Sequence, residues 1–183
     1  MRHVIRFCLV LIVLFLAVRT SFAVEKGGVT YQIPIDYSTM SAVELSEKAD
    51  FYFNTAILQN LGKVDDNVTN ALFLYAVLAD KCPDNPIYPV CLGRLYDMIG
   101  KDRYAKGNFS RAMGINPNLP EPYFYYGEFL FKRQNYRRAL KMYLEAYSKG
   151  YNEHPETLSR LNQIYTMFGD EKKAEKYVVK TEE

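Results

Sequence analysis

Few residues in this chain combine the type and the spacing that catalysis or metal binding requires. Beyond the first 23 residues the only histidine is His154, and one histidine cannot complete a histidine-based metal cluster. No serine or cysteine has a histidine placed by a motif to activate it as a nucleophile. From Gly62 onward the glycines are scattered singly, so no glycine-rich loop would hold a phosphate group. We therefore expect a protein that is not an enzyme and uses no metal and no cofactor.

The carboxylates that lie close together in the sequence have ordinary structural interpretations. Asp65-Asp66 precede a segment with helical periodicity, where an acidic side chain caps the first turn. Glu121 and Glu128 are two helical turns apart on one face, and we expect both to be solvated. Ser41 and Glu44 have the spacing of a capping box, which predicts that the first long helix begins there.

Cys82 and Cys91 allow two interpretations. If the protein is exported to an oxidising environment, this pair could form a disulfide. The closed loop of about ten residues would then stabilise the fold by about 2.5–3 kcal/mol. Alternatively, both side chains pack as small apolar groups at a junction between helices. The sequence leaves both interpretations open.

The first 23 residues have the order of a secretory signal. Arg2 and Arg6 precede the uninterrupted apolar run Phe7–Val18, and Ser21-Phe22-Ala23 places small residues where signal peptidase needs them. We expect cleavage after Ala23 and a periplasmic or extracellular location. As a helix the run would span about 18 Å, short of a hydrocarbon core of roughly 30 Å. We thus expect no stable membrane span after cleavage, with an uncleaved anchor as the alternative.

The charge balance argues against a nucleic-acid partner. Cleavage after Ala23 would reduce the basic residues from 23 to 20 against 21 acidic ones, a net charge of −1. A general electrostatic attraction to nucleic acid or to a membrane surface is therefore not expected. Residues 24–100 carry 5 basic and 10 acidic residues, whereas residues 101–183 carry 15 and 11. In an elongated molecule these ends of opposite sign could orient a partner or favour head-to-tail self-association. The alternative, which we favour, is that the solvated helix faces simply differ in charge.

The strongest pattern is a repeat of 34 residues, because residues 87–120 align with residues 121–154. Small and aromatic residues coincide in this alignment: Gly93 with Gly127, Ala105 with Ala139, Phe109 with Tyr143, and Ala112 with Ala146. A period of this length is typical of stacked repeats. Each unit also contains two successive segments with apolar residues at helical spacing. One such helical pair cannot bury its own apolar face, so the units must stack on one another.

This pattern resembles the tetratricopeptide repeat. The unit at residues 86–119 carries most of the motif, lacking only the bulky aromatic residue where Pro89 stands: Leu92, Gly93, Tyr96, Ala105, Phe109, Ala112 and Pro117. Weaker matches place further units at about 41–85, 120–154 and 155–183. The resemblance implies an all-α solenoid of about four helix-turn-helix units over residues 41–183. Residues 24–40 would form an extended or flexible N-terminal segment.

The resemblance also implies that a protein or peptide partner binds in the concave groove lined by the first helix of each pair. The residues at the corresponding positions are Tyr52, Gln59, Val90, Arg94, Asp97, Met98, Phe124, Glu128, Phe131, Lys132 and Gln163. Phe124 and Phe131 on one helical face would be apolar anchors for the partner. The alternative is that both rings pack against the neighbouring helical pair or the N-terminal segment.

Two functions fit these features of the sequence. The first is an exported, non-catalytic adaptor that holds a partner in its groove, with a role in envelope, secretion or pilus assembly implied only by analogy. The second is a structural protein that self-associates into homo-oligomers. A small enzyme or a solute binder is disfavoured by the shortage of reactive side chains.

Overall fold

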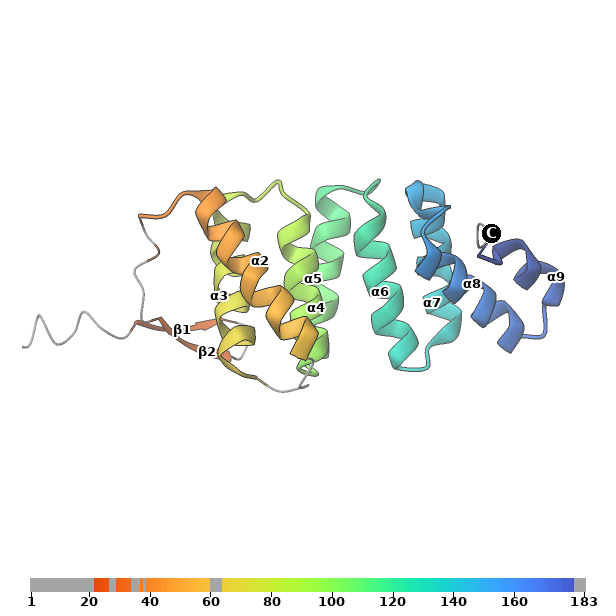
Figure 1. Ribbon diagram of the computed structural model, residues 1–183, viewed down its shortest axis with the longest axis horizontal. Coiled ribbons are helices and arrows are strands. Elements are labelled where there is room, and N and C mark those ends of the chain that lie inside the picture. The colour runs from red at the N-terminus through yellow and green to blue at the C-terminus, as the bar shows by residue number, and fades with distance from the viewer. Residues whose placement is uncertain (1–21, 27–28, 34–36, 38, 60–63, 180–183) are drawn as a thin grey trace, which may run out of the picture.

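The computed structural model describes residues 22–26, 29–33, 37, 39–59 and 64–179, which form an elongated row of helices (Figure 1). The predicted signal segment, residues 1–23, lies outside the described residues except for its last two. Successive helices are α2 (Ala42–Gln59), α3 (Asp66–Lys81), α4 (Ile87–Met98), α5 (Asp102–Ile115), α6 (Pro120–Lys132), α7 (Tyr136–Ala146), α8 (Pro155–Met167) and α9 (Glu171–Ala174). They pack as the hairpins α2–α3, α4–α5, α6–α7 and α8–α9. The predicted all-α solenoid is therefore confirmed.

A short β-hairpin precedes the helices, in the segment that the sequence analysis expected to be extended or flexible. Strand β1 (Phe22–Lys26) pairs antiparallel with β2 (Val29–Ile33), with Phe22 opposite Ile33 and Lys26 opposite Val29. Strand β2 lies against α3. Tyr37 follows, and its buried ring lies 5.6 Å from that of Phe73 on α3. The described part of this segment is thus docked on the first helical pair.

Local hydrogen bonds fix where the helices begin. The predicted capping box is confirmed, because the Ser41 amide donates to a Glu44 carboxylate oxygen at 2.8 Å and the Glu44 amide donates to the Ser41 hydroxyl at 3.3 Å. The predicted cap at Asp65 is also confirmed, since its carboxylate accepts from the Val68 amide at 2.8 Å. His154 caps α8 through Nδ1, which accepts from the Thr157 amide. Each cap satisfies a backbone donor that the helix itself leaves unpaired.

Close helix crossings explain the small residues of the repeat. A Cβ atom added at Gly127 on α6 would lie 2.7 Å from the ring of Tyr143 on α7, and one added at Gly93 on α4 would lie 2.7 Å from the ring of Phe109 on α5. Both distances are shorter than a van der Waals contact, so only glycine fits. The alanine of the repeat at position 139 is fully buried at the same crossing. The two aligned units therefore pack in the same way.

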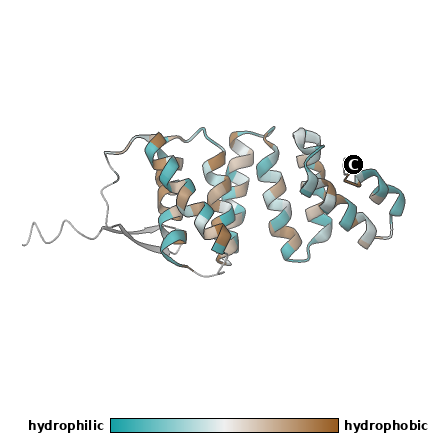
Figure 2. Ribbon diagram, viewed as in Figure 1, coloured by the Kyte–Doolittle hydropathy of each residue, from teal (hydrophilic) through white to brown (hydrophobic). Residues whose placement is uncertain are grey.

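The apolar residues form one seam along the array instead of one central core. Each hairpin packs on the next through the pairs α3–α4, α5–α6 and α7–α8, and hydrophobic residues occur along the whole row (Figure 2). A π-helical turn, Tyr147–Tyr151, extends α7. The last pair is short: α9 continues only into the 3-10 turn Glu175–Tyr177. There the ring of Tyr177 stacks on Tyr165 and closes the seam.

Both cysteines beyond the N-terminal segment are free thiols. Cys91 is buried in α4 and Cys82 is half-buried at the end of α3. The disulfide interpretation is therefore wrong for this structure, and the packing interpretation describes it. Burial raises the pKa of the Cys91 thiol to about 11, because a thiolate is poorly solvated in an apolar environment.

Candidate interaction groove

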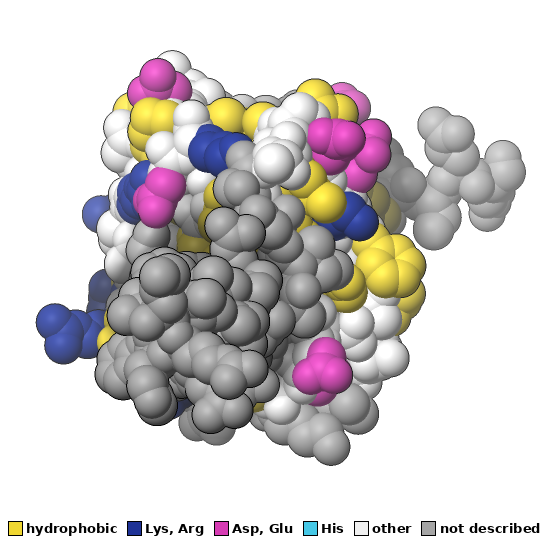
Figure 3. All heavy atoms as spheres, turned by 90° about the vertical axis from the view of Figure 1, so that its left-hand side faces the viewer, with side chains coloured by type: hydrophobic (Ala, Val, Ile, Leu, Met, Phe, Trp, Pro, Cys, Tyr) yellow, Lys and Arg dark blue, Asp and Glu magenta, His cyan; other side chains and the backbone are white. Residues whose placement is uncertain are grey.

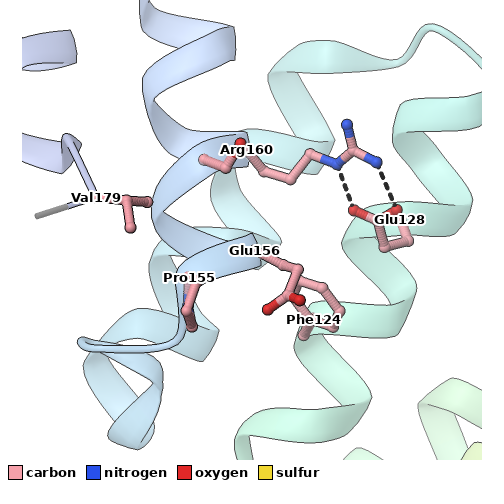
Figure 4. A pocket seen from close by; sticks show the side chains of 7 residues that line it. Phe124, Glu128, Pro155, Glu156, Arg160 and Val179 are labelled. Carbon is pink, nitrogen blue, oxygen red and sulfur yellow. Dashed lines mark hydrogen bonds and ion pairs between the residues drawn. The ribbon is translucent and has the colours of Figure 1, made fainter. Parts of the chain in front are cut away.

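Two adjoining pockets form a groove on the side of the first helices. The larger, of about 590 Å³, is lined by Ile57, Arg94, Asp97, Met98, Phe109, Phe124, Tyr125, Glu128, Lys132 and Glu156. The smaller, of about 390 Å³, is lined by Phe124, Glu128, Pro155, Glu156, Ser159, Arg160 and Val179 (Figure 4). Because the pockets share Phe124, Glu128 and Glu156, we treat them as one surface, the inner groove. It runs across α2, α4, α6 and α8.

Helical spacing brings these side chains together. Arg94, Asp97 and Met98 are three and four residues apart on α4, and Glu128 and Lys132 are four apart on α6. Residues at this spacing share one helical face. Stacking of the pairs then places the faces of successive first helices next to one another. The repeat thus aligns the groove-facing side chains of successive first helices along one continuous surface.

Arg94 occupies the middle of the inner groove. Its guanidinium carbon lies 4.7 Å from the ring centre of Phe53 on α2 and 4.1 Å from that of Tyr125 on α6. These cation–π contacts hold the guanidinium between two rings. Within the described part of the chain no acidic side chain forms an ion pair with Arg94. Its N–H donors are therefore available to a carboxylate or carbonyl of a bound partner.

The floor beside Arg94 is electrically neutralised. The side chain of Asp97 is only 8% exposed and accepts from Lys132 at 2.8 Å and from Arg133 at 2.7 Å. Arg133 also forms an ion pair with Asp102. The hydrogen bond from Arg133 is the main reason why the pKa of Asp102 lies below its usual value. This network ties α4 and α5 to the end of α6 and leaves no free carboxylate there.

A second ion pair joins α6 to α8. Arg160 donates from Nε and Nη2 to the two carboxylate oxygens of Glu128, at 2.6 and 3.0 Å (Figure 4), and the hydroxyl of Tyr143 donates to Glu128 at 2.7 Å. Burial acts to raise the pKa of Glu128, but these hydrogen bonds outweigh it and the pKa is lowered. The expectation that Glu128 is solvated is thus wrong, since its side chain is only 20% exposed. Glu121 is half-buried as well.

The predicted aromatic anchors pack inside the protein. Phe124 is 7% exposed, and its ring contacts those of Tyr143, Tyr151 and His154. Phe131 is half-buried against the ring of Tyr136, and the Arg160 guanidinium covers it at 4.5 Å. The alternative given above, packing against the neighbouring pair, therefore describes both rings. Phe124 thus forms part of the groove floor and Phe131 is covered by Arg160, so neither ring projects as a free anchor.

The structure brings six of the eleven predicted groove residues together in the pockets: Arg94, Asp97, Met98, Phe124, Glu128 and Lys132. The other five, Phe131 included, do not line them. Val90 is buried in the seam, and Tyr52 is half-buried. Gln59 accepts from Asn67, and Gln163 accepts from Arg160.

Sequence reasoning missed part of the lining: Ile57, Tyr125, Glu156, Arg160 and Val179. For two of them a signal was present. Tyr125 lies three residues before Glu128, and Arg160 lies four residues after Glu156, so each shares a helical face with a groove residue. The contribution of Val179 depends on the path of the chain after α9, which no periodicity predicts.

Two further findings concern only the part of the chain that the structure describes. No three histidine, cysteine, aspartate or glutamate side chains converge there in a way that could hold a metal ion. None of the described helices is both long and apolar enough to cross a membrane.

The chain was compared with known proteins by sequence and by structure. No protein-family model matches it, and no curated protein is significantly similar in sequence. Solved structures do match. MamA aligns with a TM-score of 0.60 at 15% identity, over 75% of this chain and 74% of MamA. PilF of Pseudomonas aeruginosa aligns with a TM-score of 0.58 at 18% identity, over 73% of this chain and 60% of PilF.

A third match carries a peptide. The first TPR domain of Spaghetti (RPAP3), solved with a bound HSP90 peptide, aligns with a TM-score of 0.58 at 22% identity, over 74% of this chain and 97% of that domain. Identities this low establish the fold alone. The helical pairs, their stacking and the groove along their first helices thus make this chain a solenoid of the tetratricopeptide-repeat type.

Proposed function

We propose that this protein is an exported, non-catalytic scaffold that holds a peptide or a helix of a partner protein in the inner groove. Assembly of envelope, secretion or pilus machinery is the setting in which such an exported scaffold would act. The observation that carries the proposal is Arg94, which forms no ion pair with any described acidic residue and is held between Phe53 and Tyr125 in the centre of the groove. A partner would present one acidic group to Arg94 and apolar side chains to Ile57 and Met98.

The shape of the groove and the structural matches support this proposal. Its larger pocket, of about 590 Å³, is within the size range of ligand sites in proteins. The matching domain of RPAP3 was solved with a peptide bound, and TPR2B of yeast Sti1, a match with a TM-score of 0.56, was solved in complex with pHsp70. Asp97 and Glu128 are held by basic partners and would not repel an acidic partner, whereas the exposed Glu156 would favour a basic group at the far end of the groove.

Peptides selected on the wild-type protein from a display library would test the groove. Arg94→Met retains an unbranched side chain between the two rings but removes the charge. Because a hydrogen bond to a charged group contributes about 1.5–3 kcal/mol, we expect R94M to weaken the selected peptides about 10- to 150-fold. Arg137→Met, on the exposed face of α7, is the matched control and should leave their affinity unchanged. Equal affinities for wild type and R94M would place the binding site on another surface.

Export is tested separately. We expect the protein recovered from an expressing bacterial culture to have an N-terminus at Val24 and to be found in the periplasmic or culture-medium fraction. A retained Met1 with the protein in the membrane fraction would instead indicate an uncleaved anchor, and a retained Met1 in the cytosol would contradict export.

Self-association is the second candidate, because apolar side chains remain exposed at both ends of the array. On α2, Phe51 is 65% and Leu58 is 85% exposed, and Figure 3 shows hydrophobic and acidic side chains around the residues drawn grey at this end. At the other end Met167 and Phe168 are exposed beside the lysines of α9. Light scattering at two salt concentrations tests it. An oligomer held by opposite charges should dissociate as salt rises, and one held by the apolar side chains should persist. A monomer under both conditions would reject this candidate.

A further inference from the structure

The outer helices α5 and α7 carry an excess of positive charge that the groove does not use. We define the outer basic surface by five exposed residues, Arg103 and Lys106 on α5 and Arg137, Arg138 and Lys141 on α7. None of the five forms an ion pair within the described part of the chain. The charge of Lys106 acts on the Asp102 carboxylate four residues before it, but the cluster as a whole keeps an excess of positive charge.

The acidic residues of the same helices are already neutralised. The acidic residue of α5 is Asp102, which pairs with Arg133, and that of α7 is Glu145, which lies 3.5 Å from Lys149. On the groove side, Asp97 and Glu128 are likewise held by basic partners. The two sides thus differ: the inner groove carries both Arg94 and the exposed Glu156, whereas the exposed charges of α5 and α7 are mainly basic. The near-neutral charge of the whole chain conceals this asymmetry.

Contacts through α6 show that the two halves of the surface adjoin. The ammonium of Lys106 lies 5.6 Å from the ring centre of Phe129, and the guanidinium of Arg138 donates to the hydroxyl of Tyr126 at 3.2 Å. The rings of Tyr126 and Phe129 are themselves 5.8 Å apart. Lys106 of α5 and Arg138 of α7 are therefore linked through two adjoining rings of α6.

The remaining features of this surface favour a flat array of phosphates over a protein partner. The only large apolar side chain exposed on the two helices is Tyr104, at one flank, so the surface lacks the buried apolar anchors typical of protein interfaces. Gly107 and Gly114 on α5 have open space above them, so the backbone there is not shielded by side chains. Clusters of four to eight basic residues are typical of proteins that bind anionic lipid headgroups.

We propose that the outer basic surface binds the surface of an anionic lipid bilayer through phosphate headgroups, without insertion. The protein would lie with α5 and α7 against the membrane and the inner groove facing away from it. This proposal does not depend on what the groove binds. Because the attraction is electrostatic, it should weaken as salt screens the charges.

Vesicle co-sedimentation of the full chain tests the proposal. Vesicles of phosphatidylcholine alone measure any contribution of the apolar run Phe7–Val18, and vesicles of phosphatidylcholine with phosphatidylglycerol add the anionic surface. We expect tighter binding to the anionic vesicles, with the difference abolished at high salt. Each basic residue near such a surface contributes about fivefold in affinity. The variant R137Q/R138Q/K141Q should thus bind anionic vesicles about a hundredfold more weakly.

A matched variant distinguishes this surface from net charge. Lys172, Lys173 and Lys176 are also exposed, and K172Q/K173Q/K176Q removes the same charge from the last helical turns. We expect this variant to bind anionic vesicles nearly as well as the wild type, and both variants to keep the wild-type circular dichroism spectrum. Equal losses in the two variants, or no loss in the first, would overturn the proposal. The proposal would also be overturned if duplex DNA displaced the protein from vesicles and if DNA binding required Arg137, Arg138 and Lys141. The outer basic surface would then be a nucleic-acid site.

Discussion

The ion pair between Glu128 on α6 and Arg160 on α8 gives the most direct test of how the helical pairs α6–α7 and α8–α9 together shape the groove. Arg160→Met keeps an unbranched side chain over the Phe131 ring, which the guanidinium now covers at 4.5 Å, and removes the two hydrogen bonds to Glu128. Glu128 would then retain only the bond from the Tyr143 hydroxyl. One carboxylate oxygen would lose its partner in a site where the Glu128 side chain is mostly buried.

The expected cost follows from that geometry. Removing one partner of a buried charge-assisted pair costs about 1.5–3 kcal/mol per hydrogen bond. The side chains of Glu128 and Arg160 are 20% and 33% exposed, so water replaces part of the lost interaction. We therefore expect R160M to lower the free energy of unfolding by about 2 kcal/mol near neutral pH. Glu128→Gln in the R160M background should recover part of this loss, because it removes the unpaired charge.

The pH dependence has a definite sign. Since the pKa of Glu128 is lowered in the folded state, its ionised form stabilises the fold above the unfolded pKa of about 4.3 and loses this effect as the pH falls through the folded value. The stability gap between wild type and R160M should thus shrink as the pH drops from about 7 to below 4. Urea unfolding followed by circular dichroism measures both quantities. Equal stability at neutral pH, or a gap that widens in acid, would refute the reasoning.

Three further outcomes are expected. Gly127→Ala should destabilise the fold by about 1–3 kcal/mol, because its Cβ would lie 2.7 Å from the Tyr143 ring. Gly107→Ala, on an open helix face, should instead stabilise the fold by about 0.5–1 kcal/mol. Thermal unfolding compares the two variants, and similar effects on stability would contradict the close crossing at Gly127. Alkylation of the reduced, folded protein followed by mass mapping should modify Cys82 and leave the buried Cys91 unmodified until urea is added; a disulfide in the air-exposed protein would contradict the free thiols. Asp65→Ala should cost about 1 kcal/mol through loss of the α3 cap, and an unchanged urea midpoint would show that the cap is dispensable.

The sequence by itself determined the architecture, because the architecture follows from local and periodic features. The 34-residue period, the small residues at Gly93 and Gly127 and the capping box at Ser41 each act over one helix or one helical pair. Such features predict where helices begin, where they cross and that they stack. The same reasoning correctly placed Arg94, Asp97 and Met98 on one face of α4.

Only the tertiary structure decided which of those residues remain available to a partner. A helical face is wider than the groove, so periodicity cannot tell whether a ring such as Phe124 lines the surface or supports it from below. Ion pairs such as that of Glu128 with Arg160 join residues 32 positions apart and depend on the angle between neighbouring pairs. That angle is set by packing along the seam. Charge counts along the chain therefore revealed neither the paired carboxylates of the inner groove nor the excess of cations on α5 and α7.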